Sequence, residues 1–167
     1  MMRNSAISRR RLLIAGTFAI GAIWSGGAVA ASNAGDEVIL TVKGRIPAPR
    51  EFTLSAFEEL GLSQLSTRTP WDQDPVAFQG VRLNRFREAL GISGNLRVTA
   101  LNDYSSVIPA EDSEFNPILA TRRAGVPLSV RDKGPLFLVY PFDEFPQLSN
   151  EAIYARCVWQ ITRIDVM

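Results

Sequence analysis

The sequence predicts an α+β fold, built mostly from mixed β-sheets with a few short helices. Short runs of alternating apolar and polar residues recur along the chain, and only two short segments between them carry helix signals. The apolar fraction is 46%, and proline and glycine residues are scattered as punctuation between the runs. These observations indicate one domain with its own hydrophobic core.

Residues 1–30 have the pattern of an export signal. The segment starts with basic residues, continues with an apolar run from Leu12 to Trp24 and ends in small residues at 28–30 that match an A-x-A cleavage site. The apolar run is shorter than the roughly 20 residues of a membrane span, so we expect cleavage rather than anchoring. The stretch SRRRLL at 8–13 resembles a twin-arginine signal, and a general secretory signal is the alternative. Both routes predict a periplasmic protein.

Behind the signal, we expect a short polar lead-in at 31–36 and a single domain at 37–167. The first strand is indicated by an alternation in which Val38, Leu40 and Val42 form one face and Ile39, Thr41 and Lys43 the other. In chain order, the elements predicted for the first half are a strand from Glu37 to Ile46, a helix with a capping box of Ser55 and Glu58 that ends at Gly61, an extended segment from Gln64 to Thr69, a polar loop from Trp71 to Pro75, a short strand with a turn at Gly80, and a helix capped near Asn84 and ended by Gly91.

The second half is predicted to complete the sheets. Residues 118–130 carry no clear secondary-structure signal and stay ambiguous. The other expected elements are a strand from Leu96 to Leu101, a loop from Ala110 to Pro117, a strongly apolar strand from Pro135 to Phe142 that is buried on both faces, and a closing strand from Tyr154 to Val166.

The charge balance excludes two classes of partner. Four of the 18 basic residues and none of the 17 acidic residues lie in the expected signal, which leaves 14 against 17, or a net charge of −3, for the mature chain. This balance gives no electrostatic basis for nucleic-acid binding. The mature chain also has no second long apolar segment, so we expect no direct membrane insertion after signal cleavage.

Histidine and cysteine usage narrows the chemistry. The chain has no histidine, which removes the commonest general base and a common metal ligand. Its single cysteine, Cys157, excludes an intramolecular disulfide and is predicted to be a small buried apolar residue on the closing strand. The acidic segments 72–74 and 111–114 lack the spacing of a calcium loop and are predicted to be solvated. We therefore expect no catalytic and no metal-binding residues.

The order of several segments resembles the molybdopterin-binding domain of the sulfite oxidase family. They are VKGRIPAP, FQGVRLNRFREALG, ALNDYSSVIPAED, ILATRRAGVPLSV, GPLFLVYPF and VWQITRIDV, and the resemblance covers about Val38 to Val166. It implies a fold that cradles a pterin. In catalytic members of the family a cysteine upstream of the F-x-G-V segment binds molybdenum, but the corresponding stretch here holds Ser66, Thr67 and Thr69. A neutral hydroxyl is a poor substitute for a soft thiolate, so the resemblance implies pterin binding without the protein's bond to the metal.

Short exported members without this cysteine resemble bacterial periplasmic pterin-binding regulators. This resemblance implies a reduced pterin ligand, such as a tetrahydropterin, with molybdopterin as the less favoured cofactor. It also implies a partner, the periplasmic domain of an inner-membrane sensor that makes or degrades cyclic-di-GMP and controls biofilm formation. Two alternatives stay open: a molybdopterin-dependent oxidoreductase that keeps molybdenum without a cysteine ligand, and a protein-interaction domain with a vestigial pocket.

The candidate pterin-binding residues are polar or aromatic side chains near predicted strand ends. Asp103 is expected to accept both donors of the pterin's amidine-like edge, with Tyr104 and Ser105 beside it; a turn-capping role is its alternative. Trp71 is expected to stack on the ring. Arg68 and Thr69 are expected to reach the ring carbonyl or a polar tail, Arg122 to bind an anionic tail, and Tyr140 to place its hydroxyl at the pocket rim. For these residues the alternatives are ordinary surface or packing roles.

Overall fold

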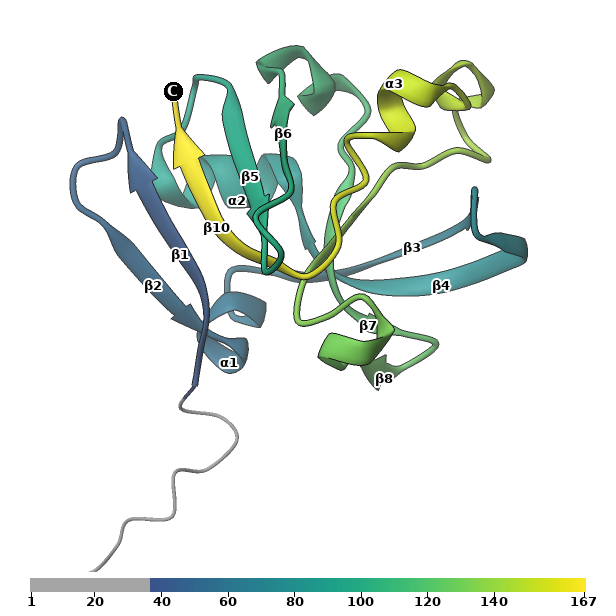
Figure 1. The fold of residues 1–167 in the computed structure, drawn as a ribbon, viewed down its shortest axis with the longest axis horizontal. Coiled ribbons are helices and arrows are strands. Elements are labelled where there is room, and N and C mark those ends of the chain that lie inside the picture. The colour runs from purple at the N-terminus through teal and green to yellow at the C-terminus, as the bar shows by residue number, and fades with distance from the viewer. Residues whose placement is uncertain (1–36) are drawn as a thin grey trace, which may run out of the picture. The chain divides into compact units, whose positions relative to one another are not determined.

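Strands β1 (Val38–Gly44) and β10 (Ile161–Val166) are the first and last strands in the sequence, and they pair in parallel inside a five-stranded sheet. The computed structural model describes residues 37–167, and its first sheet has the order β2-β1-β10-β5-β6 (Figure 1). The other members are β2 (Arg50–Thr53), β5 (Leu96–Ala100) and β6 (Ser105–Ile108), which pair antiparallel with their neighbours. The sheet is therefore mixed, as the sequence predicted.

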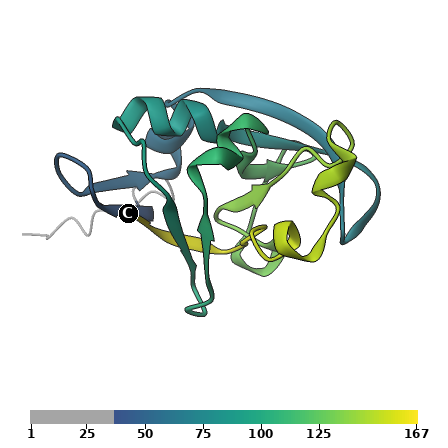
Figure 2. The same ribbon diagram turned by 90° about the horizontal axis from the view of Figure 1, so that it is seen from above.

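The second sheet is antiparallel and contains a long hairpin. Its order is β3-β4-β7-β8, and β9 also pairs with β7. Its strands are β3 (Leu62–Thr69), β4 (Asp72–Arg82), β7 (Ile118–Arg123), β8 (Val126–Pro127) and β9 (Phe137–Val139). Figure 1 shows the β3–β4 hairpin extending away from the first sheet, and Figure 2 shows the β5–β6 hairpin projecting in another direction.

Helices are few and short. They are α1 (Leu54–Glu58), α2 (Leu83–Leu90) and α3 (Glu151–Tyr154), with 3₁₀ turns η1 (Ala110–Glu114), η2 (Val130–Asp132) and η3 (Pro146–Leu148). Within residues 37–167, no helix has the length and apolar character to cross a membrane. The expected export signal and lead-in, residues 1–36, lie outside the described residues.

The hydrophobic core follows the predicted strand patterns. Leu40 and Val42 are fully buried on alternate positions of β1, and all three residues of β9 are buried. Helix α2 ends as predicted, because Gly91 takes the left-handed conformation with φ 64° that favours glycine. Strong local patterns were therefore sufficient to place these elements.

The predicted capping box of the first helix is wrong. Thr53, not Ser55, is the N-cap, and its Oγ1 accepts from the backbone N–H of Ala56 at 3.3 Å. Glu58 does not cap the helix, because Arg122 donates to both of its carboxylate oxygens at 2.9 and 2.8 Å. A long-range, charge-assisted pair thus replaces the local one.

The predicted turn at Gly80 is also wrong, because β4 runs straight through it to Arg82. A Cβ atom at Gly80 would lie 2.1 Å from the carbonyl oxygen of Leu119 on β7. Glycine is required here for the close approach of two strands rather than for a turn. The next helix starts after Arg82, and the backbone N–H of Asn84 donates to the Asn116 side chain at 3.2 Å.

Three further expectations differ from the structure. The polar segment 71–75 is not a loop: only Pro70 and Trp71 separate β3 from β4, and 72–75 belong to β4. The closing strand begins at Ile161, because residues 151–154 form α3. The segment 111–114 is a 3₁₀ turn whose Asp112 is buried, so this acid is not solvated.

Candidate functional site

The turn between β3 and β4 fixes the first aromatic side chain of the candidate site. Thr69 donates its hydroxyl to a carboxylate oxygen of Asp72 at 2.6 Å and accepts from the backbone N–H of Trp71 at 3.2 Å. Arg123 donates to the other carboxylate oxygen of Asp72. This network holds a short turn in one conformation and sets the direction in which the Trp71 indole leaves the hairpin.

The β5–β6 hairpin provides the second wall. Asn102 accepts from the backbone N–H of Tyr104 at 3.2 Å through its side-chain oxygen, which is the local bond of an Asx turn. Asp103 occupies the left-handed position of this turn with φ 64° and donates its N–H to the carbonyl of Ala100 at 3.1 Å. The Tyr104 hydroxyl then reaches across and donates to the carbonyl of Ala155 at 2.8 Å. The hairpin tip is thereby joined to the segment that follows α3.

Residues 155–160 form the floor. This segment leaves α3, whose N-cap Asn150 accepts from the backbone N–H of Ile153 at 3.2 Å. The N–H of Leu138 on β9 donates to the carbonyl of Val158 at 2.9 Å, so the segment packs beside the buried strand. Cys157 is 3% exposed, which confirms its predicted burial, although it lies in an irregular segment instead of a strand.

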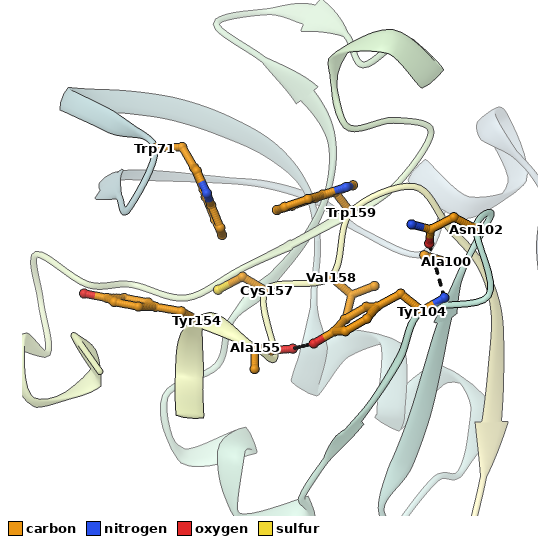
Figure 3. Close-up of a pocket in the computed structure, with 9 residues that line it drawn as sticks. All are labelled: Trp71, Ala100, Asn102, Tyr104, Tyr154, Ala155, Cys157, Val158 and Trp159. Atoms are coloured by element: carbon orange, nitrogen blue, oxygen red, sulfur yellow. Dashed lines mark hydrogen bonds between the residues drawn. The ribbon is translucent and has the colours of Figure 1, made fainter. Parts of the chain in front are cut away.

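These three segments enclose a cavity of about 210 Å³, open to solvent. Figure 3 shows Trp71 and Trp159 on one side, Cys157 and Val158 in the middle, Tyr154 at one end, and Asn102 with Tyr104 at the other. The two indoles meet edge to face, with ring centroids 5.1 Å apart and an interplanar angle of 86°. None of the residues that line the cavity carries a charged side chain.

A cation lies against the aromatic wall. The ammonium of Lys133 is 4.6 Å from the ring centroid of Trp71, 5.3 Å from that of Phe137 and 5.8 Å from that of Trp159. These distances are within cation–π range. Burial lowers the pKa of the Lys133 ammonium, and the nearby Asp72 carboxylate partly opposes that effect.

The thiol in the cavity wall is held in its neutral form. Burial raises the pKa of Cys157 to about 12, although a backbone hydrogen bond and the Lys133 charge favour the thiolate. A thiol with this pKa is protonated at neutral pH and is a weak nucleophile and a weak metal ligand. The cavity wall is therefore apolar at this point.

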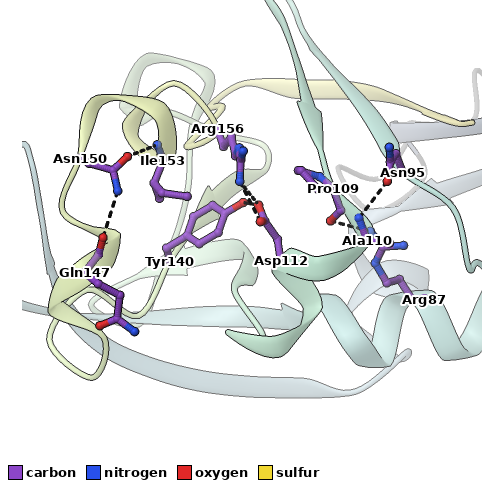
Figure 4. Close-up of polar contacts among 10 residues, drawn as sticks. All are labelled: Arg87, Asn95, Pro109, Ala110, Asp112, Tyr140, Gln147, Asn150, Ile153 and Arg156. Carbon is purple, nitrogen blue, oxygen red and sulfur yellow. Dashed lines mark hydrogen bonds and ion pairs between the residues drawn. The ribbon is translucent and has the colours of Figure 1, made fainter.

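A buried polar network supports the floor from below. Asp112 accepts from the Tyr140 hydroxyl and from Arg156, whose Nη1 lies 2.8 and 2.9 Å from the two carboxylate oxygens (Figure 4). Tyr140 is fully buried, so its predicted place at a pocket rim is wrong; burial and the Asp112 carboxylate raise the pKa of its phenol. Because Arg156 directly precedes Cys157, the network fixes the backbone of the cavity floor.

The other predicted site residues are divided among different places. Trp71 and Tyr104 line the cavity together. Arg68 and Thr69 line a neighbouring cavity, whereas Asp103 and Ser105 are exposed on the β5–β6 hairpin and line neither. Arg122 is paired with Glu58 at the side of α1, so its guanidinium is already engaged by a carboxylate.

Sequence reasoning missed several residues of the cavity. They are Asn102, Tyr154, Val158 and Trp159, together with Lys133 behind the wall. Asn102 directly precedes Asp103, and asparagine favours turns as aspartate does, so the sequence alone could have identified it as a candidate. No local pattern distinguishes Lys133 or Tyr154 from ordinary surface residues.

The donor set does not fit a molybdenum ligand. In the stretch where the resemblance would place a metal-binding cysteine, Thr67 donates its hydroxyl to the carbonyl of Arg68 and accepts from the backbone N–H of Asp143, both at 3.1 Å. Thr69 is engaged by Asp72 and Trp71, as described above. Among residues 37–167, no cluster of three histidine, cysteine or carboxylate side chains is placed to hold a metal ion.

Comparison with known proteins supports the fold. No protein-family model matches the chain, and no curated protein matches it at the level of sequence. Among solved structures, the chain is similar to sulfane dehydrogenase SoxCD from Paracoccus pantotrophus, with a TM-score of 0.59 and 16% sequence identity over 80% of this chain. The match spans 39% of the dehydrogenase chain. The chain thus has the predicted α+β, sulfite-oxidase-like fold.

Proposed function

We propose that this domain binds a reduced pterin in the cavity between Trp71 and Tyr104, without molybdenum catalysis. The observation that carries the proposal is an uncharged cavity with an aromatic wall and one side-chain amide. Ligand pockets for drug-sized molecules have volumes of about 300 to 1,000 Å³. A cavity of about 210 Å³ suits a single flat ring system better than an entire large cofactor.

The polar groups at one end of the cavity match the pyrimidine edge of a pterin. That edge presents N–H donors beside a ring carbonyl, and a side-chain amide offers both an acceptor and donors. Asn102 occupies the position that the sequence assigned to Asp103, while the Tyr104 oxygen keeps lone pairs after donating to Ala155. Neutral recognition of this kind also agrees with the uncharged lining.

Tryptophan fluorescence during titration with dihydrobiopterin tests the proposal. We expect saturable quenching, and Trp71→Ala should weaken the affinity about tenfold through lost stacking and apolar contact. Leu62→Ala is the matched control, because Leu62 is an exposed apolar residue on the far end of β3. Absence of saturable binding for every reduced and oxidised pterin would overturn the proposal.

A second pair of variants distinguishes the two candidates for edge recognition. Asn102→Ala removes both the acceptor and the donors of the side-chain amide, so pterin affinity should fall; circular dichroism checks that the hairpin stays folded without the bond from the Tyr104 N–H. Asp103→Ala should leave the affinity nearly unchanged, because Asp103 lies outside the cavity lining. A loss of binding confined to Asp103→Ala would restore the sequence-based assignment.

Molybdopterin-dependent oxidation is the second candidate function, favoured by the fold shared with a dehydrogenase. The engaged hydroxyls of Thr67 and Thr69 and the neutral Cys157 thiol argue against a protein bond to the metal. Metal analysis of protein purified from its native compartment tests this candidate. Near-stoichiometric molybdenum would favour the enzyme over the binding module.

The signalling half of the proposal concerns export and a partner. We propose that residues 1–30 direct the domain to the periplasm, where it regulates the periplasmic domain of a membrane sensor that makes or degrades cyclic-di-GMP. Exposed aromatic side chains that line the cavity, Trp71, Tyr104 and Trp159, support a contact that depends on the ligand. They also suit an interaction domain with a vestigial pocket.

Cell fractionation and capture from membranes test this half. The protein should appear in the periplasm with its first 30 residues removed, and retention of the sensor should change when dihydrobiopterin is added. Retention that is independent of pterin, together with an empty cavity in protein freshly extracted from cells, would favour the interaction domain.

A further inference from the structure

A second, polar cavity adjoins the aromatic one at Tyr154. It has a volume of about 170 Å³, and Arg68, Thr69, Asp143 and Ser149 are among its lining residues. Tyr154 lines both cavities, and Pro70 and Trp71, which are neighbours in the β3–β4 turn, line one cavity each. A ligand in the aromatic cavity therefore has a polar compartment directly beyond Tyr154.

The charges of the polar cavity cancel. Asp143 accepts from the backbone N–H of Arg68 at 3.1 Å and from its guanidinium at 3.0 Å. A site for a phosphate or carboxylate would present an unpaired cation, whereas here a carboxylate stands beside the only guanidinium in the lining. The hydroxyls of Ser149 and Tyr154 add neutral hydrogen-bonding groups. The compartment is thus polar and electrically balanced.

The arrangement of the two cavities favours one orientation of a bound pterin ring. Asn102 lies at the end of the aromatic cavity opposite Tyr154 (Figure 3). In a pterin, the pyrimidine edge and the side-chain substituent are at opposite ends of the bicyclic ring. When the edge is at Asn102, the substituent points toward Tyr154 and the polar cavity.

We infer that the polar cavity selects pterins with a short, neutral hydroxyalkyl side chain and disfavours phosphorylated ones. This inference rests on the proposed pterin site and names the ligand class within it. Neutral hydroxyls donate to the Asp143 carboxylate and accept from Arg68, Ser149 or Tyr154. A phosphate in the same place would face a carboxylate of like charge and lose its own hydration.

A series of ligands tests the inference on the mature protein. We expect dihydrobiopterin and dihydroneopterin to bind about fivefold more tightly than a dihydropterin without a side chain, because each adds hydrogen bonds. Dihydroneopterin phosphate should bind about tenfold more weakly than dihydroneopterin. Equal affinities for all four overturn the inference but leave the proposed function intact, whereas no binding by any of them overturns the proposed function itself.

Charge variants make the assignment specific to the polar cavity. Asp143→Asn keeps an acceptor for the Arg68 N–H and removes the negative charge, so discrimination against the phosphorylated ligand should fall to about twofold or less. Arg68→Gln removes the guanidinium that balances the Asp143 carboxylate, while the backbone N–H still donates to it, and should increase that discrimination. Both variants should bind unsubstituted dihydropterin as the wild type does, which shows that the ring site remains folded.

Asp165→Asn is the matched control. Asp165 pairs with Arg163 at 3.1 Å, and its carboxylate side chain is 34% exposed, against 33% for Asp143. It lines neither cavity, so the order of ligand affinities should not change. The inference fails if Asp143→Asn keeps the wild-type discrimination against the phosphorylated ligand, or if Asp165→Asn changes it equally. Either result would show that the polar cavity does not recognise the pterin's substituent.

Discussion

The ammonium of Lys133 lies 4.6 Å from the ring centroid of Trp71, on the loop that follows η2. This contact joins two segments that are far apart in the sequence and holds an indole that otherwise projects from a hairpin turn. Trp71 is 42% exposed, so packing against the core alone does not fix its ring. The cation therefore contributes to the shape of the cavity wall.

Lys133→Met should weaken both the fold and ligand binding. Methionine keeps most of the side-chain length but loses the cation–π attraction, which is worth about 0.5 to 2 kcal/mol depending on desolvation. Urea unfolding should show a stability loss in this range, and pterin affinity should fall a few-fold. Lys43→Met on β1 is the control, because Lys43 is exposed and makes no cation–π contact among residues 37–167. Equal effects of the two variants would refute a specific role of Lys133.

Cys157 should resist alkylation until the pH is high. Because burial raises its pKa to about 12 in the folded protein, iodoacetamide should react slowly at neutral pH, whereas the unfolded thiol ionises at about 8.5. The stability due to the neutral buried thiol is fully present below the unfolded pKa. It is lost as pH rises toward the folded value.

Alkylation rates measured from pH 7 upward, in buffer and in urea, check this prediction. Cys157→Ala should remove the corresponding decrease in unfolding free energy at alkaline pH. Rapid labelling of the folded protein near neutrality would contradict the burial of the thiol.

Tyr140→Phe should destabilise the domain by about 1 to 3 kcal/mol, because it removes a donor from a buried carboxylate. Asp112 is 4% exposed and would keep only Arg156 as its partner. Urea denaturation measures the loss. Tyr154→Phe is the control, since the Tyr154 hydroxyl has no hydrogen bond within residues 37–167. Similar stability of both variants would mean that the Tyr140 bond contributes nothing.

Glu58→Gln should make stability less sensitive to acid. The Arg122 guanidinium lowers the pKa of Glu58 in the folded protein, although burial opposes this. The stability from this pair is present above the unfolded pKa of glutamate, about 4.3, and is lost as pH falls through the lower folded value. Melting curves between neutral pH and the acid range should show a smaller acid-induced decrease in the variant.

The exposed pair Arg85–Glu88 provides a control for that experiment. The Glu88 side chain is 72% exposed, so Glu88→Gln should follow the wild-type acid profile. An acid profile of Glu58→Gln that coincides with the wild type would show that the pair with Arg122 has no net effect on stability.

Much of the fold could be predicted from the sequence, because strand alternation and helix ends depend on residues that are close together in the chain. Alternation placed Leu40 and Val42 in the core of β1, and Gly91 ended α2 in the left-handed conformation. The capping box failed because Thr53 and Ser55 both carry hydroxyls at the start of the same helix. Local chemistry allowed either one, and the pairing of Glu58 with Arg122 across the domain decided between them.

The candidate site was only partly predictable. Trp71 and Tyr104 were named because the resemblance implied a pterin and because they follow predicted strands, and they line one cavity. Gly80 carried a turn signal, but the contact that requires glycine comes from β7, far along the chain. Tyr140 was predicted to place its hydroxyl at a pocket rim because it ends an apolar strand. In the structure Asp112 and Arg156 provide a buried polar environment for that hydroxyl.

The sequence alone thus determined the α+β class, the buried strands, the absence of histidine and the single cysteine. Only the tertiary structure decided that Trp71, Tyr104 and Cys157 share a cavity, that Asn102 instead of Asp103 faces it, and that Lys133 lies behind it. The physical reason is range. Periodicity and turn chemistry act over a few residues, whereas stacking, cation–π contacts and desolvation depend on segments that meet only after both sheets have formed.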